Sequence, residues 1–531
     1  MKKIGFKIAG ILAAILIAAV YYYITIPAIN IHSSGFWTFL MVAIAVVVVL
    51  YAIPRVRTVS DVKSNGIIKL GIGVLLLVVA VYLVGSLLSS PIINAKKYQR
   101  LITVENRDFA EDIKEVDYRQ IPLLDRDSAM LLGDRKMGSM VDMVSQFEVS
   151  PLYTQINYQD SPSRVTPLVY ASPIKWLTNQ SKGVPAYIKI DMATQDTELV
   201  KLDKPIRYSQ SEYFNRNINR HLRFRYPTYI FDTLSFEIDD NGTPYWVCPV
   251  KKYNIGLFGG VTIGRVVLCN AQTGETVDYK VEDCPTWVDH VFSADLLIQL
   301  YDYYGTLKNG YFNSILGQKG CLKTTEGYNY LALEDDVWVY TGITSVNSDQ
   351  SNVGFVLMNQ RTMECRYYEV AGAQEYSAMG SAEGQVQNLG YEATFPLLLN
   401  ISGEPTYFMA LKDDAGLVKK YAMVNIQKYQ NVAIGDTVSE CEKNYNSLLR
   451  QSGIEVEESE GEVKKASGAI ERIAQGVIDG NSHYYLLLEG RDEIFDVSVV
   501  DYLDIIKYQE GDRITLEYTE GAEVNTVLGI Q

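Results

Sequence analysis

Three long apolar runs dominate the first 94 residues of the chain. They cover residues 8–29, 35–53 and 70–88, and none contains a charged residue. A helix needs about 20 apolar residues to cross the hydrocarbon core of a bilayer. Three such runs in succession are poor candidates for buried core helices, so we predict a membrane domain with three transmembrane helices over residues 1–94. The first run lacks a small-residue cleavage site and exceeds the apolar part of a signal peptide, which predicts an uncleaved helix.

The distribution of basic residues predicts the orientation of these helices. Lysines and arginines precede the first run and separate the second from the third, whereas residues 30–34 contain neither. Loops rich in Lys and Arg stay in the cytoplasm. We therefore expect a multi-pass protein of the cell membrane with a cytoplasmic N-terminus and an extracytoplasmic region after Ser90. Lys96, Lys97 and Arg100 count against this orientation, although the rule weakens at the start of a long domain.

The pattern changes after the membrane domain. Residues 95–122 are charged, and we interpret them as a partly helical stalk. Residues 125–137 follow a helical rhythm that begins at an Asp. From Phe147 onward, short alternating segments are separated by Pro, Asn and Gly, which is typical of antiparallel strands.

One motif returns along this strand-rich region. Residues 266–281 read VVLCNAQTGETVDYKV, and residues 355–370 read FVLMNQRTMECRYYEV. Looser copies occupy residues 187–202 and 421–434, and the first three copies follow one another at about 80–90 residues. Such spacing predicts a repeated structural unit, and each copy reads as strand, tight polar turn, strand.

The second copy shows the expected anatomy of a unit. We predict a helix over residues 211–222, then strands at 233–238 and 244–250 joined by the hairpin signal Asn241-Gly242. A helix packed on a small antiparallel sheet is an α+β design. The predicted tandem repeats cover residues 123–210, 211–292, 293–380 and 381–451.

The last part of the chain predicts a second type of domain. Residues 452–466 are rich in Glu and read as an exposed acidic linker. Residues 467–531 contain five strand patterns with a short helix between the third and fourth, which resembles a small OB-fold β-barrel. The segment is acidic, so we expect a structural or protein-binding barrel. The fold class is thus a membrane-anchored α+β protein.

The hairpin motif resembles the last hairpin of PepSY domains. Asn270 to Glu275 match it well, Met363 replaces the Gly of the motif in the next copy, and the match is weaker at residues 191–196. The resemblance implies an extracytoplasmic binding or inhibitory module that acts on peptidases or on assembly, without a catalytic residue. It does not extend to the whole chain.

Charge and motif content exclude several classes of function. The net charge is −15 although the first 90 residues are basic, so the remainder is strongly acidic and unsuited to nucleic acid. The six cysteines lack C-x-x-C spacing, the four histidines lack metal-ligand spacing, and there is no phosphate-loop sequence. We expect no metal, no cofactor and buried free thiols; pairing of Cys248 with Cys269 is the alternative.

Two groups of residues are candidates for partner binding. On the predicted helix, Arg216, Arg220 and Arg223 would share one face and bind an acidic partner or anionic wall or lipid groups, unless they form a solvated face. The glycine-rich residues 256–265 predict a mobile hairpin tip. Its Leu257 and Phe258 would touch a partner or the membrane surface.

These observations favour a non-enzymatic extracytoplasmic scaffold, sensor or peptidase-modulating protein. We expect its partners to be the lipid bilayer and envelope or secreted proteins, with the oligomeric state left open. One alternative is an envelope hydrolase that uses Asp289 and His290, although we favour the interpretation of these residues as a surface pair at a helix start. The other is a cytosolic adaptor, if the topology is inverted.

Overall fold

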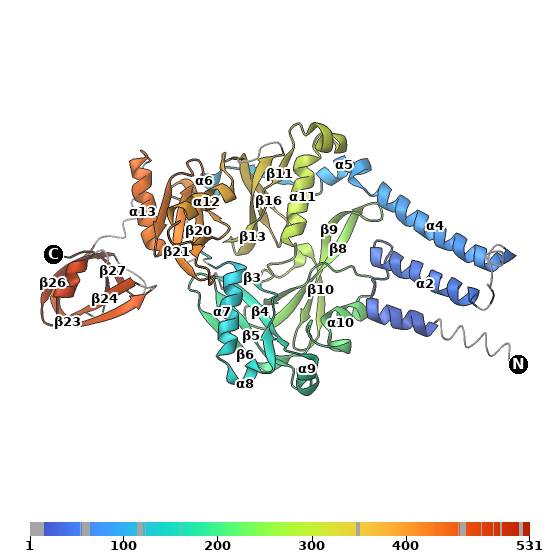
Figure 1. Cartoon of the computed structure of the whole chain (residues 1–531), viewed down its shortest axis with the longest axis horizontal. Coiled ribbons are helices and arrows are strands. Elements are labelled where there is room, and N and C mark those ends of the chain that lie inside the picture. Colours follow the sequence, from blue (N-terminus) through green and yellow to red (C-terminus); the bar gives the residue numbers. More distant parts are fainter. Residues whose placement is uncertain are drawn as a thin grey trace.

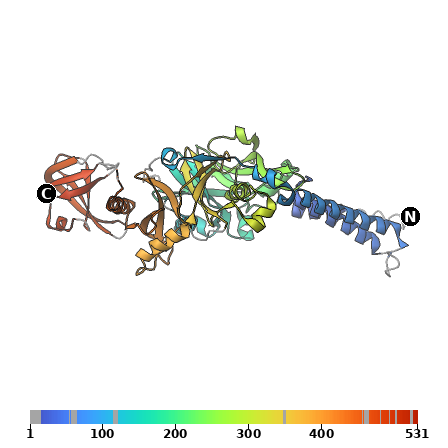
Figure 2. The same ribbon diagram turned by 90° about the horizontal axis from the view of Figure 1, so that it is seen from above.

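The computed structural model describes residues 15–53, 55, 64–113, 121–122, 124–159, 161–346, 351–454, 456, 464–478, 481–491, 493–499, 502–519 and 524–530. It is a mixed α+β structure with antiparallel sheets. Figures 1 and 2 show three parts in a row: apolar helices at one end, a body of sheets and helices in the middle, and a small sheet structure at the other end.

Among the described residues, two helices, α2 (Ser34–Ala52) and α4 (Gly66–Leu88), are long and apolar enough to cross a membrane. Polar residues set where they begin, because Ser33 and Asn65 accept hydrogen bonds from the first free backbone N–H groups. The first predicted span, residues 8–29, lies partly outside the described residues. Its described part contains a shorter apolar helix, Ile15–Thr25.

Four antiparallel meanders of four strands form the body. The first consists of β3 (Thr154–Tyr158), β4 (Ser161–Tyr170), β5 (Val184–Asp191) and β6 (Thr197–Ile206). The second consists of β7 (Ser235–Ile238), β8 (Pro244–Ile255), β9 (Gly259–Asn270) and β10 (Thr276–Lys280). The third consists of β12 (Asn329–Leu333), β13 (Asp336–Ser345), β15 (Gly354–Asn359) and β16 (Cys365–Tyr368). The fourth consists of β19 (Leu397–Ile401), β20 (Glu404–Lys412), β21 (Val418–Asn425) and β22 (Val432–Gly435).

Short strands extend these sheets. β2 (Phe147–Val149) pairs with β4, β11 (Leu322–Thr324) pairs with β13, and β18 (Glu392–Ala393) pairs with β20. A separate two-stranded sheet joins β14 (Ser351–Asn352) to β17 (Gly372–Ala373).

The last turn of each meander is closed by the same side-chain hydrogen bonds. The carboxamide of Asn270 accepts from the backbone N–H groups of Gln272 and Thr273 at 2.9 and 3.0 Å. Asn359, Asp191 and Asn425 make the equivalent bonds to the second and third residues after them. An Asx turn of this kind needs Asn or Asp, which explains why these columns of the motif are shared.

A helix precedes each meander. These helices are α7 (Arg126–Gly138), α10 (Ile218–Arg225), α11 (Ala294–Thr306) and α12 (Glu375–Gln385), and α13 (Val438–Gln451) follows the last meander. We call each meander with its preceding helix a unit. Two shorter helices, α8 (Val141–Val144) and α9 (Pro173–Asn179), belong to the first unit.

Two predicted helix limits are wrong. The helix predicted over residues 211–222 begins only at Ile218, because Asn217 has an extended backbone and caps α10. A separate 3-10 turn, η2 (Phe214–Arg216), precedes it. In the fourth unit α12 begins at Glu375, so the expected boundary at residue 381 falls inside a helix.

Successive units share hydrophobic cores, because the sheet between them is apolar on both faces. Trp246 and Cys248 of β8 are buried with the first unit, whereas Val247 between them is buried with the third. In the third unit, Val339 faces the second unit and Trp338 faces the fourth. The period of two along a strand places neighbours on opposite faces, so the continuous apolar runs produce a stack.

The stalk expected at residues 95–122 is wrong in its described part. This segment contains α5 (Pro91–Gln99), β1 (Val104–Arg107) and α6 (Phe109–Asp112). β1 pairs in parallel with β16, and Phe109 and Ile113 are buried in the core of the third and fourth units. Burial of these apolar side chains makes the segment part of the body; residues 114–120 and 123 lie outside the described residues.

Five strands form the C-terminal part. They are β23 (Lys464–Ile478), β24 (Asn481–Leu488), β25 (Ile494–Ser498), β26 (Arg513–Thr519) and β27 (Asn525–Ile530). Their pairing closes in the order β23, β24, β25, β27, β26, with β26 returning to β23. A 3-10 turn, η5 (Leu503–Lys507), takes the place of the expected short helix. β23 begins at Lys464, inside the predicted linker, most of which lies outside the described residues.

Candidate functional site

The hairpin tip between β8 and β9 rests on the end of α4. Ser89, the residue that ends α4, accepts hydrogen bonds on its Oγ from the backbone N–H groups of Leu257 and Phe258 at 2.8 and 3.1 Å. The same hydroxyl donates to the carbonyl of Gly85 at 2.6 Å. Ser89 is buried, so these bonds are shielded from water. The expectation of a mobile tip is therefore wrong; we call this arrangement the tip–helix contact.

Glycines make the tip–helix contact possible. A Cβ atom on Gly259 would lie 2.2 Å from the backbone oxygen of Ser89, and one on Gly85 would lie 2.8 Å from Leu257 Cδ1. Gly256 has a φ of +59°, which side chains disfavour, and a Cβ there would lie 2.4 Å from Ser89 Oγ. The glycines of this segment thus serve the close approach of the hairpin tip to the end of α4.

Aromatic contacts surround this tip. The ring of Phe258 lies 5.1 Å from that of Tyr82 on α4 and 6.3 Å from that of Trp37 on α2. His32, in the loop before α2, shares a hydrogen bond of 2.7 Å between its Nδ1 and the carbonyl of Leu257. Leu257 and Phe258 therefore contact the apolar helices of their own chain.

The three predicted arginines do not share one helical face. Arg216 lies in η2 and donates to the carbonyl of Gln180 at 2.7 Å. Arg220 places its guanidinium 4.9 Å from the ring of Tyr23, in a cation–π geometry. Arg223 donates to the carbonyl of Ile26 at 3.0 Å, and burial lowers the pKa of its guanidinium. Arg220 and Arg223 thus join α10 to the end of the first apolar run; a separate partner for the three arginines stays a prediction.

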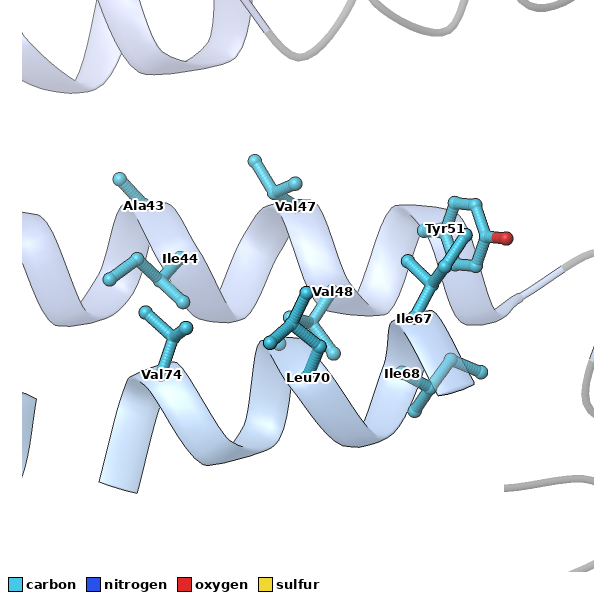
Figure 3. A pocket seen from close by; sticks show the side chains of 10 residues that line it. Ala43, Ile44, Val47, Val48, Tyr51, Ile67, Ile68, Leu70 and Val74 are labelled. Carbon is cyan, nitrogen blue, oxygen red and sulfur yellow. The ribbon is translucent and has the colours of Figure 1, made fainter. Parts of the chain in front are cut away.

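An apolar groove of about 430 Å³ lies between α2 and α4, away from the body. Figure 3 shows its lining, which includes Val48, Leu70 and Val74 and whose only polar side-chain group is the Tyr51 hydroxyl. Gly71 brings the helices close here, because a Cβ on it would lie 2.5 Å from Val48 Cγ2. The lining contains no carboxylate, imidazole, amine or thiol that could act together with the Tyr51 hydroxyl in acid–base or nucleophilic chemistry.

A buried polar junction surrounds Asp289 and His290. The Asp289 carboxylate accepts from the backbone N–H of Asn157 at 2.8 Å. Glu237 accepts from the backbone N–H groups of Asp289 and His290 at 2.9 and 3.2 Å. The His290 Nε2 lies 2.6 Å from the carbonyl oxygen of Gln155. These bonds tie the first and second units to the segment that leads into α11, so the expected surface pair is wrong: Asp289 is only 1% exposed.

Burial raises the pKa of both Glu237 and Asp289. The neighbouring charge of Glu237 raises the pKa of Asp289 further, because two carboxylates in a dry site repel one another. No sequence pattern singles out Glu237, which stands in an ordinary strand segment. The two carboxyl groups therefore lie together in the buried contact between units.

A cavity of about 180 Å³ beside the junction is lined by His290, Ser293 and Tyr330, among others. A catalytic pair needs Asp289 to orient the imidazole of His290. Within the part of the chain that the structure describes, the two side chains instead bond to different backbone groups, Asn157 N–H and Gln155 C=O. The geometry is that of an interface between units.

All six cysteines are free and buried. Burial raises the pKa of Cys269 and Cys284 to about 12, so their thiols stay protonated and unreactive at neutral pH. The prediction of buried free thiols is confirmed. Among the described residues, no cluster of His, Cys, Asp or Glu is arranged to hold a metal ion.

Comparison with known proteins adds no relative to this picture. No family model matches the chain, and no curated protein is significantly similar to it. The PepSY-like and OB-like resemblances therefore stay predictions.

Proposed function

We propose that this chain is a membrane-anchored binding protein without catalytic activity, and that its body is presented on the extracytoplasmic side. The tip–helix contact supports the anchoring, and the basic residues before the first apolar run and between the second and third support the side of the membrane. The tip–helix contact fixes the body at the end of α4, while Arg223 and His32 bond the body to the loop that joins the first apolar run to α2. The outer loop and the end of α4 therefore meet the body together, as three crossings require.

The proposed mode of binding is a stack of repeated modules. The shared Asx turns and the order of strands in the four meanders support the interpretation as tandem PepSY-like repeats. The closing strand order, with β27 between β25 and β26, supports an OB-like barrel at the far end. A stack of this kind offers a long surface to envelope or secreted proteins, as a scaffold, sensor or peptidase modulator.

Photo-crosslinking in cells tests the binding role. A photoreactive residue replaces one exposed apolar side chain at a time: Ile174 in the first unit, Val277 in the second, and Tyr376 and Tyr429 in the fourth. We expect a protein adduct at one or more of these positions. Leu503 of the barrel is also exposed and is substituted in the same way as a control, and we expect no adduct there. Absence of an adduct at all four positions in membrane-inserted protein would contradict the proposal.

The hydrolase alternative predicts a different result. His290→Ala leaves a binding protein with the same adducts, because the imidazole serves the junction between units. A hydrolytic activity of the full chain that disappears in folded His290→Ala protein would instead establish the enzyme.

A further inference from the structure

An exposed apolar knob follows α11. It is formed by Phe312, Ile315 and Leu316, in and beside the single-turn helix η4 (Asn313–Gly317), and these side chains are 69%, 54% and 81% exposed. Large apolar side chains left in water forgo the stabilisation that burial would give. Three of them on one short turn form a patch that needs a partner.

This knob is held beside the start of the body. Tyr98 of α5 packs its ring 4.8 Å from that of Tyr303 on α11, and both join a small core with Leu307 and Tyr311. α5 follows α4 directly, and Figure 1 shows it between the body-side end of α4 and the segment after α11. Ile92 and Ile93 on α5 are also exposed. The apolar side chains of α5 and the knob therefore stand next to the end of the proposed membrane helix.

The residues close in sequence to these apolar side chains include basic residues and no acidic ones. Residues 91–104 and 303–325 contain no Asp or Glu. They contain six basic residues: Lys96, Lys97, Arg100, Lys308, Lys319 and Lys323. This concentration stands out in a chain with a net charge of −15. Lys96, Lys97, Arg100, Lys308 and Lys319 are exposed.

We propose that Ile92, Ile93, Phe312, Ile315 and Leu316 form a lipid-contact patch that enters the surface of the bilayer, with the surrounding lysines bound to anionic phospholipid headgroups. The inference rests on the proposed membrane anchoring and adds a second point of attachment. Apolar side chains among cations are the composition by which interfacial segments bind anionic membranes. Because α5 continues from α4, the bilayer is the surface nearest to the patch. Attachment there would fix the tilt of the body relative to the membrane.

Depth-dependent fluorescence quenching tests the patch. Because all native cysteines are buried, Leu316→Cys provides a single reactive thiol for an environment-sensitive dye. The full chain is reconstituted in vesicles of phosphatidylcholine with phosphatidylglycerol that contain spin-labelled lipid. Two matched variants are labelled in the same way. Val81→Cys on α4 is the reference for a position inside the bilayer. Val141→Cys on α8 is the reference for water, because Val141 is 82% exposed.

We expect lipid quenching of the dye at position 316 to be at least half of that at position 81, and several-fold above that at position 141. Quenching at 81 with none at 316 overturns the patch while the anchoring stands. No quenching at either position overturns the anchoring itself.

Charge reversal identifies the lipid headgroup as the ligand. The double variant Lys308→Glu with Lys319→Glu, labelled at position 316, loses most of its quenching in vesicles that contain phosphatidylglycerol and changes little in phosphatidylcholine alone. If dyes on separate copies instead quench one another in detergent as protein concentration rises, a second copy covers the knob and the lipid assignment is wrong.

Discussion

Ser89 is the residue on which the tip–helix contact depends most. Its hydroxyl receives two backbone N–H groups of the hairpin tip, and their loss leaves two buried donors unpaired. We expect Ser89→Ala to destabilise the folded chain by about 1–3 kcal/mol. The measurement is thermal unfolding in detergent together with protease cleavage between β8 and β9.

Ser86→Ala is the matched control for this change. Ser86 lies on the same helix, and its hydroxyl donates only to the carbonyl of Tyr82. The control is expected to unfold close to wild type and to keep a protected tip. Equal effects of the two substitutions would show that the tip–helix contact contributes no stability.

The raised pKa of Asp289 predicts that the stability of the folded chain depends on pH. Because its pKa is raised in the folded protein, its contribution is fully present below the pKa of the unfolded chain and is lost as pH rises through the native value. For each unit by which the native pKa of Asp289 exceeds its pKa in the unfolded chain, protonation stabilises the folded chain by about 1.4 kcal/mol. Asp289→Asn keeps an acceptor for Asn157 and should remove this loss.

The measurement compares unfolding temperature from pH 5 to pH 8 in wild type and variant. Wild type should lose more stability than Asp289→Asn over this range, and the exposed Asp240→Asn should behave as wild type. Parallel curves for wild type and Asp289→Asn would contradict the assignment of a raised pKa to Asp289.

At the level of elements, the Asx turns use Asp in one unit and Asn in another, which predicts how substitutions at Asn270 affect stability. Asp191 makes in the first unit the bonds that Asn270 makes in the second. Asn270→Asp should therefore leave stability nearly unchanged, whereas Asn270→Ala should cost about 1 kcal/mol by analogy with helix caps. Denaturant unfolding checks both, and a neutral Asn270→Ala would show that the backbone closes the turn without the side chain.

The local sequence pattern predicts where helices and strands lie better than it predicts which of them contact one another. The hairpin motif and the strands of the barrel follow from alternation and turn residues, which act over a few positions. The arginine face failed because Asn217 ends one turn and caps the next helix, a choice made by a single residue. Leu257 and Phe258 contact the apolar helices of their own chain, and their binding to a separate partner stays a prediction. Leu257 bonds to Ser89, which is 168 positions away, and no local signal indicates this contact. Glu237 was missed for the same reason.

At the scale of the whole molecule, the buried thiols report on the stack of units. Five of the six cysteines lie in the cores shared between units, so their reactivity requires that units separate or unfold. We expect negligible maleimide labelling of the native chain and labelling of all six after denaturation, measured by mass spectrometry. Rapid native labelling of Cys248 or Cys269 would contradict the packing of the second unit on the first.

Protease access to intact cells shows on which side of the membrane the body lies. Cells that express the full chain with a tag after Gln531 are treated with protease before and after the membrane is opened, with a cytosolic protein as the internal control. With an extracytoplasmic body, we expect the tag and body to be degraded in intact cells while the control protein survives. Protection of the tag until the membrane is opened would instead place the body in the cytosol.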